Sequence, residues 1–98
     1  MFITTTTSKP QADQIESAEA YLAALLPRLR ELPGIIAVYH FRRPEQQEDV
    51  TIVVWKDQAA LKNYRESPLF QEAVAYEKEN QIPSVREGFP LVYPVSQN

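Results

Sequence analysis

The sequence predicts a single α+β domain over residues 1–98, with the βαββαβ order of ferredoxin-like folds. A chain of 98 residues has the size of one small domain. Apolar residues recur at three- and four-residue steps over residues 15–32, which is the spacing of an amphipathic helix. Runs rich in β-branched residues before and after this helix indicate strands, and together they predict a four-stranded antiparallel sheet.

The N-terminal third of the chain contains the first predicted strand and helix. Met1–Thr7 is β-branched and polar, as expected for a strand with one partly solvated face. Asp13 and Glu16 have the spacing of a capping box and predict the start of a helix of roughly five turns. We expect Pro27 to bend this helix, and Pro33–Gly34 to end it.

The middle of the chain predicts a hairpin followed by a short helix. Ile35–Phe41 is apolar on both faces, and Val50–Trp55 is a second β-branched run. The charged segment 42–49 between them contains no apolar residue, so we expect an exposed loop. Asp57 is a suitable N-cap for a short helix that extends to about Glu66.

The C-terminal third predicts a second helix and a last strand. Ser67–Pro68 combines a serine N-cap with a proline in the first turn, and the helix runs to about Asn80. Residues 81–87 are expected to form a loop, and Gly88–Val95 the last strand. Its two prolines cannot donate to a ladder, so we expect it at a sheet edge or with a bulge.

This element order leaves one face of the sheet without helices. That face is apolar in the predicted strands and too large to remain in water. Two copies could pair their sheets into a barrel, so the sequence predicts a homodimer joined through its sheet faces.

Composition excludes several classes of function. The net charge is −3 and the ten basic residues do not form a long run, which argues against nucleic acid as a partner. The absence of cysteine and the presence of one histidine argue against a metal site. The chain shows no signal peptide and no segment of membrane-spanning length, so we expect a soluble, cytoplasmic protein without a membrane partner.

Three segments together resemble the antibiotic-biosynthesis-monooxygenase family. They are Leu32–Gly34 before an apolar strand, Thr51–Leu61 with the sequence TIVVWKDQAAL, and Tyr64–Phe70 with the sequence YRESPLF. The similarity extends from about Phe2 to Tyr93. It implies a dimeric α/β barrel, and an oxygenase reaction that requires no bound flavin or metal.

Two branches of this family differ in their site residues. The haem-degrading branch uses an asparagine on the first strand, a tryptophan in the short helix and a histidine in the next helix. This chain has Thr5–Thr7, Tyr64 and Val74 at those places, and valine cannot ligate iron. The similarity therefore argues against haem degradation.

The polyketide-oxidising branch is similar in a tryptophan at the end of the third strand, matched here by Trp55. Its Tyr–His pair on the second strand is matched by Tyr39 and His40. Two further polar positions of that branch are Leu61 and Thr51 here.

His40 is the candidate catalytic residue, because histidine is the side chain best suited to act as a base near neutral pH. The alternative is an ordinary histidine at a strand end. Trp55 is a candidate pocket residue that could stack on a flat substrate, or else a core tryptophan that anchors a helix to the sheet.

Tyr64, Phe70 and Tyr39 complete the candidate substrate-binding residues, as aromatic side chains that could hold a planar molecule. Tyrosines in this chain could equally lie in a dimer interface. The leading hypothesis is a cofactor-independent monooxygenase that acts on a small aromatic or quinol-type molecule. The alternatives are a small-molecule-binding or stress-related barrel without catalysis, and a purely structural dimerisation module. The space behind Trp55 distinguishes the three.

Overall fold

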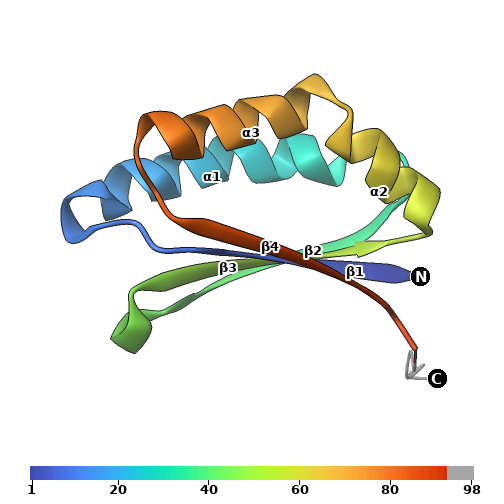
Figure 1. Cartoon of the computed structure of the whole chain (residues 1–98), viewed down its shortest axis with the longest axis horizontal. Helices are drawn as coiled ribbons and strands as arrows, with labels where there is room; N and C mark the ends of the chain where they lie inside the picture. Colours follow the sequence, from blue (N-terminus) through green and yellow to red (C-terminus); the bar gives the residue numbers. More distant parts are fainter. Residues whose placement is uncertain (93–98) are drawn as a thin grey trace.

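The computed structural model describes residues 1–92, which form one sheet covered on one face by helices (Figure 1). The elements in chain order are β1 (Phe2–Ser8), η1 (Ala12–Gln14), α1 (Ile15–Arg30), β2 (Ile35–Arg43), η2 (Pro44–Gln46), β3 (Glu48–Trp55), α2 (Gln58–Arg65), α3 (Pro68–Glu79) and β4 (Ser84–Pro90). The four strands are antiparallel in the order β2-β3-β1-β4, so the predicted ferredoxin-like βαββαβ fold is confirmed.

The sheet register determines which side chains face the helices. In the β2–β3 hairpin, His40 lies opposite Thr51 and Arg42 lies opposite Asp49. Both strands extend into the segment that the sequence predicted as an exposed loop, and only the short turn η2 and Gln47 remain between them. That prediction was wrong for Asp49, which is buried, because charge alone did not reveal the inward position in the strand.

Two of the three predicted helix caps are present. The Asp57 carboxylate accepts a hydrogen bond from Ala60 N at 2.9 Å, and the Ser67 hydroxyl accepts one from Phe70 N at 3.3 Å. The predicted cap at Asp13 was wrong, because residues 12–14 form a 3₁₀ turn and α1 begins after Gln14. The Gln14 side chain instead donates to Asn80 O at 2.6 Å, which links the start of α1 to the end of α3.

The last strand begins four residues earlier than the sequence predicted. β4 pairs with β1 from Ser84, opposite Ser8, to Pro90, opposite Phe2, and it lies at a sheet edge as expected. The predicted loop over residues 81–87 was wrong from Ser84 onward, since strand pairing with β1 outweighs the polar composition of this segment. The end of the predicted strand, from Tyr93 to Val95, lies outside the described residues.

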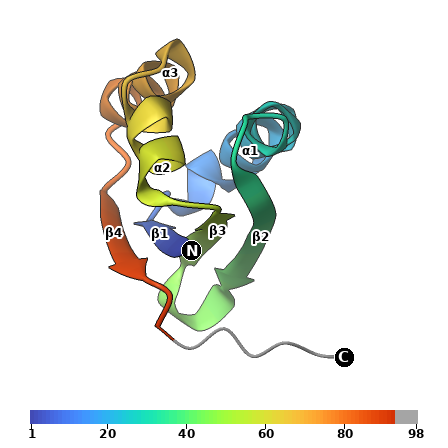
Figure 2. The ribbon, with the colours of Figure 1, turned by 90° about the vertical axis from the view of Figure 1, so that its right-hand side faces the viewer.

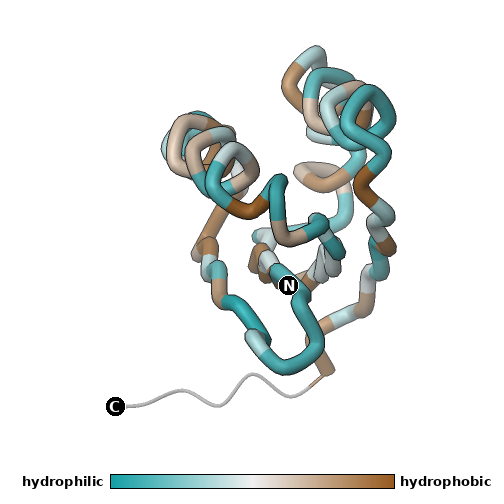
Figure 3. The backbone as a smooth tube through the Cα atoms, turned by 90° about the vertical axis from the view of Figure 1, so that its left-hand side faces the viewer, coloured by the Kyte–Doolittle hydropathy of each residue, from teal (hydrophilic) through white to brown (hydrophobic). Residues whose placement is uncertain are grey.

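The core lies between the helices and the inner face of the sheet. Its buried members are Leu25, Leu29, Val53, Trp55, Leu61, Leu69 and Ala73. Figure 3 shows hydrophobic positions in the strands as well as in the helices above them. Within residues 1–92, no helix combines the length and the apolar character needed to cross a membrane.

No helix of residues 1–92 covers the opposite face of the sheet (Figure 2), and that face carries exposed apolar side chains. They are Tyr39 and Phe41 on β2, and Val85 and Phe89 on β4. Such a group of large exposed apolar residues is unusual for a surface in contact with water.

Gly34 forms the tight connection between α1 and β2. Its φ of +85° lies in the left-handed region, and its carbonyl accepts a hydrogen bond from Lys56 N at 2.7 Å. A Cβ atom at this position would overlap the Cβ of Ala60 in α2. Glycine is therefore required for both backbone conformation and space.

We expect Gly34→Ala to lower the free energy of unfolding by about 2–4 kcal/mol, from left-handed strain and overpacking together. Urea denaturation measures this change. Gly88→Ala is the matched control, since its Cβ would lie no closer than 3.1 Å to another atom, the Phe2 Cε1. Equal losses for the two variants would contradict the argument.

Candidate functional site

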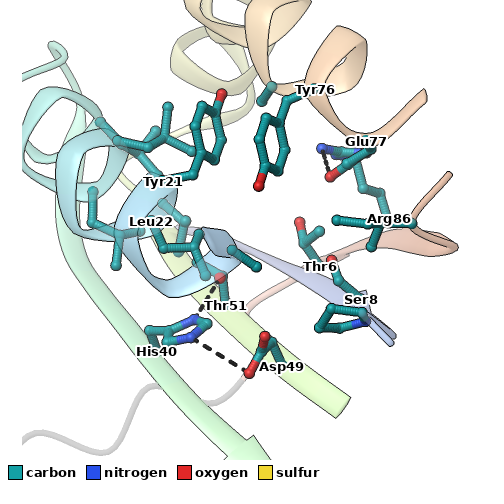
Figure 4. Close-up of a pocket in the computed structure, with 18 of the residues that line it drawn as sticks. Thr6, Ser8, Tyr21, Leu22, His40, Asp49, Thr51, Tyr76, Glu77 and Arg86 are labelled. Carbon is teal, nitrogen blue, oxygen red and sulfur yellow. Dashed lines mark hydrogen bonds and ion pairs between the residues drawn. The ribbon is translucent and has the colours of Figure 1, made fainter. Parts of the chain in front are cut away.

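A cavity of about 90 Å³ lies between the sheet and the helices (Figure 4). One wall is apolar and is formed by α1 through Leu22, Leu25, Leu26 and Leu29. The sheet side is lined by small hydroxyl residues: Thr4, Thr6 and Ser8 on β1, and Thr51 on β3. The inner face of β1 thus provides small side chains where a filled core would have large ones.

His40 lies at one end of this cavity on the inner face of β2. Its Nδ1 is 2.9 Å from Thr51 Oγ1, at hydrogen-bond distance, and its Nε2 is 3.9 Å from Asp49 Oδ1. The side chain is 23% exposed, so the ring is sheltered without being sealed from solvent. The sequence predicted His40 as a site residue but gave no prediction for the carboxylate beside it.

Asp49 is the one buried charged side chain within residues 1–92, with 4% of its surface exposed. Arg42 faces it across the hairpin, with Nε 2.9 Å from Oδ1 and Nη2 donating to Oδ2 at 3.1 Å. Arg42 also contacts Glu19 of α1 at 3.1 Å. Strand alternation with Thr51 and Trp55 was the sequence signal that could have placed Asp49 inside.

The other end of the cavity contains a second ion pair. The Arg86 guanidinium donates to both carboxylate oxygens of Glu77, at 2.7 and 2.8 Å. Beside it, Tyr76 of α3 stacks on Tyr21 of α1 with ring centroids 3.9 Å apart. Burial raises the pKa of the Tyr21 phenol, whose oxygen has no hydrogen-bond partner in residues 1–92.

Only two of the five predicted site residues meet at this cavity. His40 and Tyr64 line it. Trp55 is fully buried in the core, where its Nε1 donates to Thr4 Oγ1 at 2.9 Å, and it lies outside the cavity lining. Phe70 packs edge-on against Tyr64 with centroids 5.2 Å apart, also away from the lining.

Tyr39 lies on the opposite face of the sheet, where 59% of its surface is exposed. Adjacent residues of a strand face opposite sides, so Tyr39 and His40 cannot both point into one cavity. The described residues contain no group of three or more side chains placed to hold a metal ion.

This arrangement can bind a small planar molecule and exchange a proton with it. The α1 leucines provide apolar contact for a ring, and the His40 imidazole, a group able to accept a proton, lines the same cavity. The hydroxyl groups and the two ion pairs give the cavity polar ends, which could orient a ligand that has oxygen atoms.

Comparison with known proteins relates the chain to one family. The family model described as Antibiotic biosynthesis monooxygenase matches residues 1–76. No curated protein matches this chain by sequence.

Solved structures share the fold at low sequence identity. A provisionally named antibiotic biosynthesis monooxygenase from Deinococcus radiodurans superposes with a TM-score of 0.90 at 13% identity, covering 100% of this chain and 99% of that chain. Rv0793 from Mycobacterium tuberculosis has a TM-score of 0.83 at 18% identity, with 98% and 100% covered. PA3566 from Pseudomonas aeruginosa has a TM-score of 0.77 at 16% identity, with 97% and 94% covered.

Burial of the Tyr64 phenol raises its pKa above the ordinary value of 10.0. The unfolded chain therefore loses this proton at lower pH than the folded chain does. The contribution of Tyr64 to the free energy of unfolding is fully present below about pH 10 and declines as the pH rises through the folded-state pKa. We expect the free energy of unfolding of Tyr64→Phe to decline less steeply above that pH than that of the wild type, in urea denaturation.

The comparison uses the slope against pH, so a constant loss from the missing hydroxyl does not affect it. Tyr21, whose pKa burial also raises, accounts for part of the decline that remains. Identical slopes for the two proteins would contradict the effect of burial on Tyr64.

Proposed function

The chain belongs to the antibiotic biosynthesis monooxygenase family, and we propose that it is a monooxygenase-like enzyme that acts on a small aromatic or quinol-type molecule without a bound cofactor. One observation supports this proposal above all. The only histidine of the chain lies in a cavity next to apolar walls, where a ring can approach its imidazole.

The size of the cavity restricts the substrate. An engineered apolar cavity of about 150 Å³ accepts benzene. The cavity here measures about 90 Å³, so it accepts at most one small ring unless lining side chains move. We therefore favour single-ring phenols and hydroquinones over compounds with three fused rings.

The chemistry assigned to this chain begins with proton removal. His40 accepts the proton of a phenolic hydroxyl, and the resulting anion is electron-rich enough to reduce O₂ directly. One oxygen atom enters the product as a carbonyl or hydroxyl oxygen, and the other leaves as water together with two hydrogens of the substrate. The substrate supplies all the electrons, so the balance requires no further reductant.

A second candidate is binding without catalysis, which the leucine wall of α1 favours. A cavity for storage alone would gain little from polar groups, however, since unpaired polar groups weaken binding of an apolar ligand. The polar end formed by His40, Thr51 and Asp49 favours the enzyme over this alternative.

We expect the purified protein to consume O₂ with at least one member of a panel of phenols, hydroquinones and anthrones. His40→Ala should lower this rate by about 10²- to 10⁴-fold, the usual contribution of a general base. An oxygen electrode measures the rate. Glu45→Ala in the exposed turn η2 is the matched control and should retain the full rate.

Three outcomes of this assay distinguish the enzyme from the binding protein and test the role of His40. Uptake that depends on His40 supports the proposal. Uptake that is unchanged in His40→Ala contradicts the role of His40. Ligand binding by calorimetry with no uptake at all contradicts the enzyme and favours the binding protein.

We also propose that a second copy of the chain covers the open face of the sheet. Tyr39, Phe41, Val85 and Phe89 are each between 41% and 60% exposed on that face. A self-complementary apolar surface suits the twofold symmetry of most homodimers. This pairing gives Tyr39 a place in an interface, where tyrosine is enriched.

We expect sedimentation equilibrium to give twice the chain mass for the wild type. Phe41→Glu should weaken this association by about tenfold or more, because it places a charge in an apolar interface. Lys78→Glu, on the helix side of the molecule, is the control and should remain dimeric. A wild type that is monomeric at all concentrations would disprove the pairing.

A further inference from the structure

The proposed reaction assigns no step to Asp49, although burying this carboxylate is costly. A carboxylate with 4% exposure loses most of its hydration, which destabilises a protein unless close partners compensate. A β-hairpin at the edge of a sheet does not need a buried carboxylate in order to fold. Its partners indicate what it does.

Arg42 holds the Asp49 carboxylate in place. Its Nη2 donates to Oδ2 at 3.1 Å, and its Nε lies 2.9 Å from Oδ1. Arg42 is held in turn by Glu19 of α1, at 3.1 Å. One hydrogen bond and one charge contact to the same planar guanidinium leave the carboxylate little freedom to rotate.

The oxygen Oδ1 faces His40. It is buried and accepts no hydrogen bond from residues 1–92, because the contact with Arg42 Nε lacks hydrogen-bond geometry. The nearest histidine nitrogen is Nε2, 3.9 Å away. A bare nitrogen lone pair facing this oxygen would be repelled, whereas an Nε2–H bond directed toward it is attracted.

We therefore expect the neutral ring to carry its proton on Nε2, which leaves Nδ1 as the basic nitrogen. Nδ1 lies 2.9 Å from Thr51 Oγ1, and with this tautomer the Thr51 hydroxyl is the donor of that hydrogen bond. Thr51 also lines the cavity, and Figure 4 shows its oxygen between the ring and the open space.

We propose that Asp49, His40 and Thr51 form a proton relay, in which Asp49 is the positioning residue that holds the basic nitrogen of His40 toward Thr51. The ligand hydroxyl gives its proton to Thr51 Oγ1 as the Thr51 proton moves to Nδ1. The resulting imidazolium then has one N–H directed at Thr51 and the other at the Asp49 carboxylate.

The same three groups do not form a nucleophilic triad. Thr51 lies in β3 between two paired neighbours, β1 and β2, so the backbone N–H groups around it belong to sheet ladders. An acyl-transfer site needs free donors for an oxyanion. The geometry fits transfer of a proton and not attack by the hydroxyl.

The relay rests on the proposed role of His40, but its first test does not need a substrate. The chain has one histidine, so ¹⁵N NMR of the imidazole gives a single pair of ring nitrogens. At a pH where the ring is neutral, we expect a protonated Nε2 and a bare Nδ1 in the wild type. Asp49→Asn should shift the tautomer balance toward Nδ1–H. A wild-type ring protonated on Nδ1 would overturn the relay, whether or not the variant folds.

Glu48→Gln is the matched control, because it makes the same chemical change one residue away, on the other face of β3. It should leave the tautomer unchanged. An unchanged tautomer in folded Asp49→Asn overturns the role of Asp49.

With a substrate, Asp49→Asn should lower kcat by about 10²-fold with little change in KM, since the base is present but misdirected. Thr51→Val should cause a similar loss, and Thr51→Ser should restore the rate because it returns the hydroxyl. Equal rates for Thr51→Val and Thr51→Ser would overturn the relay. Absence of turnover in the wild type, with the expected tautomer, contradicts the proposed enzyme but supports the positioning by Asp49.

Discussion

The packing of Trp55 at the end of β3 is the interaction on which the arrangement of the helices over the sheet depends. The indole has no exposed surface, and its Nε1 donates a hydrogen bond to Thr4 Oγ1 on the neighbouring strand β1. Its ring centroid lies 5.3 Å from that of Tyr64. It therefore fills the space between α2 and the sheet at one end of the domain. A buried side chain of this size typically contributes several kcal/mol to stability. The empty volume lies farther along β3, from Val53 back to Asp49.

Small polar residues on β1 explain why that volume remains open. Thr4, Thr6 and Ser8 project toward the helices at positions where a filled core would have leucine or phenylalanine. Their hydroxyls also need partners when buried, and some find them nearby, as Ser8 does with Ser84 at 3.1 Å. The cavity thus costs the protein packing energy that a larger apolar side chain would recover, which is consistent with a use for the space.

The similarity to solved structures concerns the fold and not the site. The solved structures described above share nearly the whole fold at 13–18% identity. Ferredoxin-like sheets tolerate such divergence because the fold requires a pattern of apolar and polar positions more than particular side chains. The residues at a few positions inside the cavity therefore determine what it can bind, whatever the similarity of the fold.

The sequence by itself determined the element order, two helix caps and the hairpin, because these features follow from short-range periodicity and from residues within one turn of each other. It also predicted His40 and Tyr64 as site residues, and both line the cavity. Only the tertiary structure decided that Trp55 packs the core, that Tyr39 faces away from His40, that β4 starts at Ser84 and that Asp49 is buried beside Arg42. Each of these depends on sheet register and on partners far along the chain, and a shift of one residue in register would reverse every face.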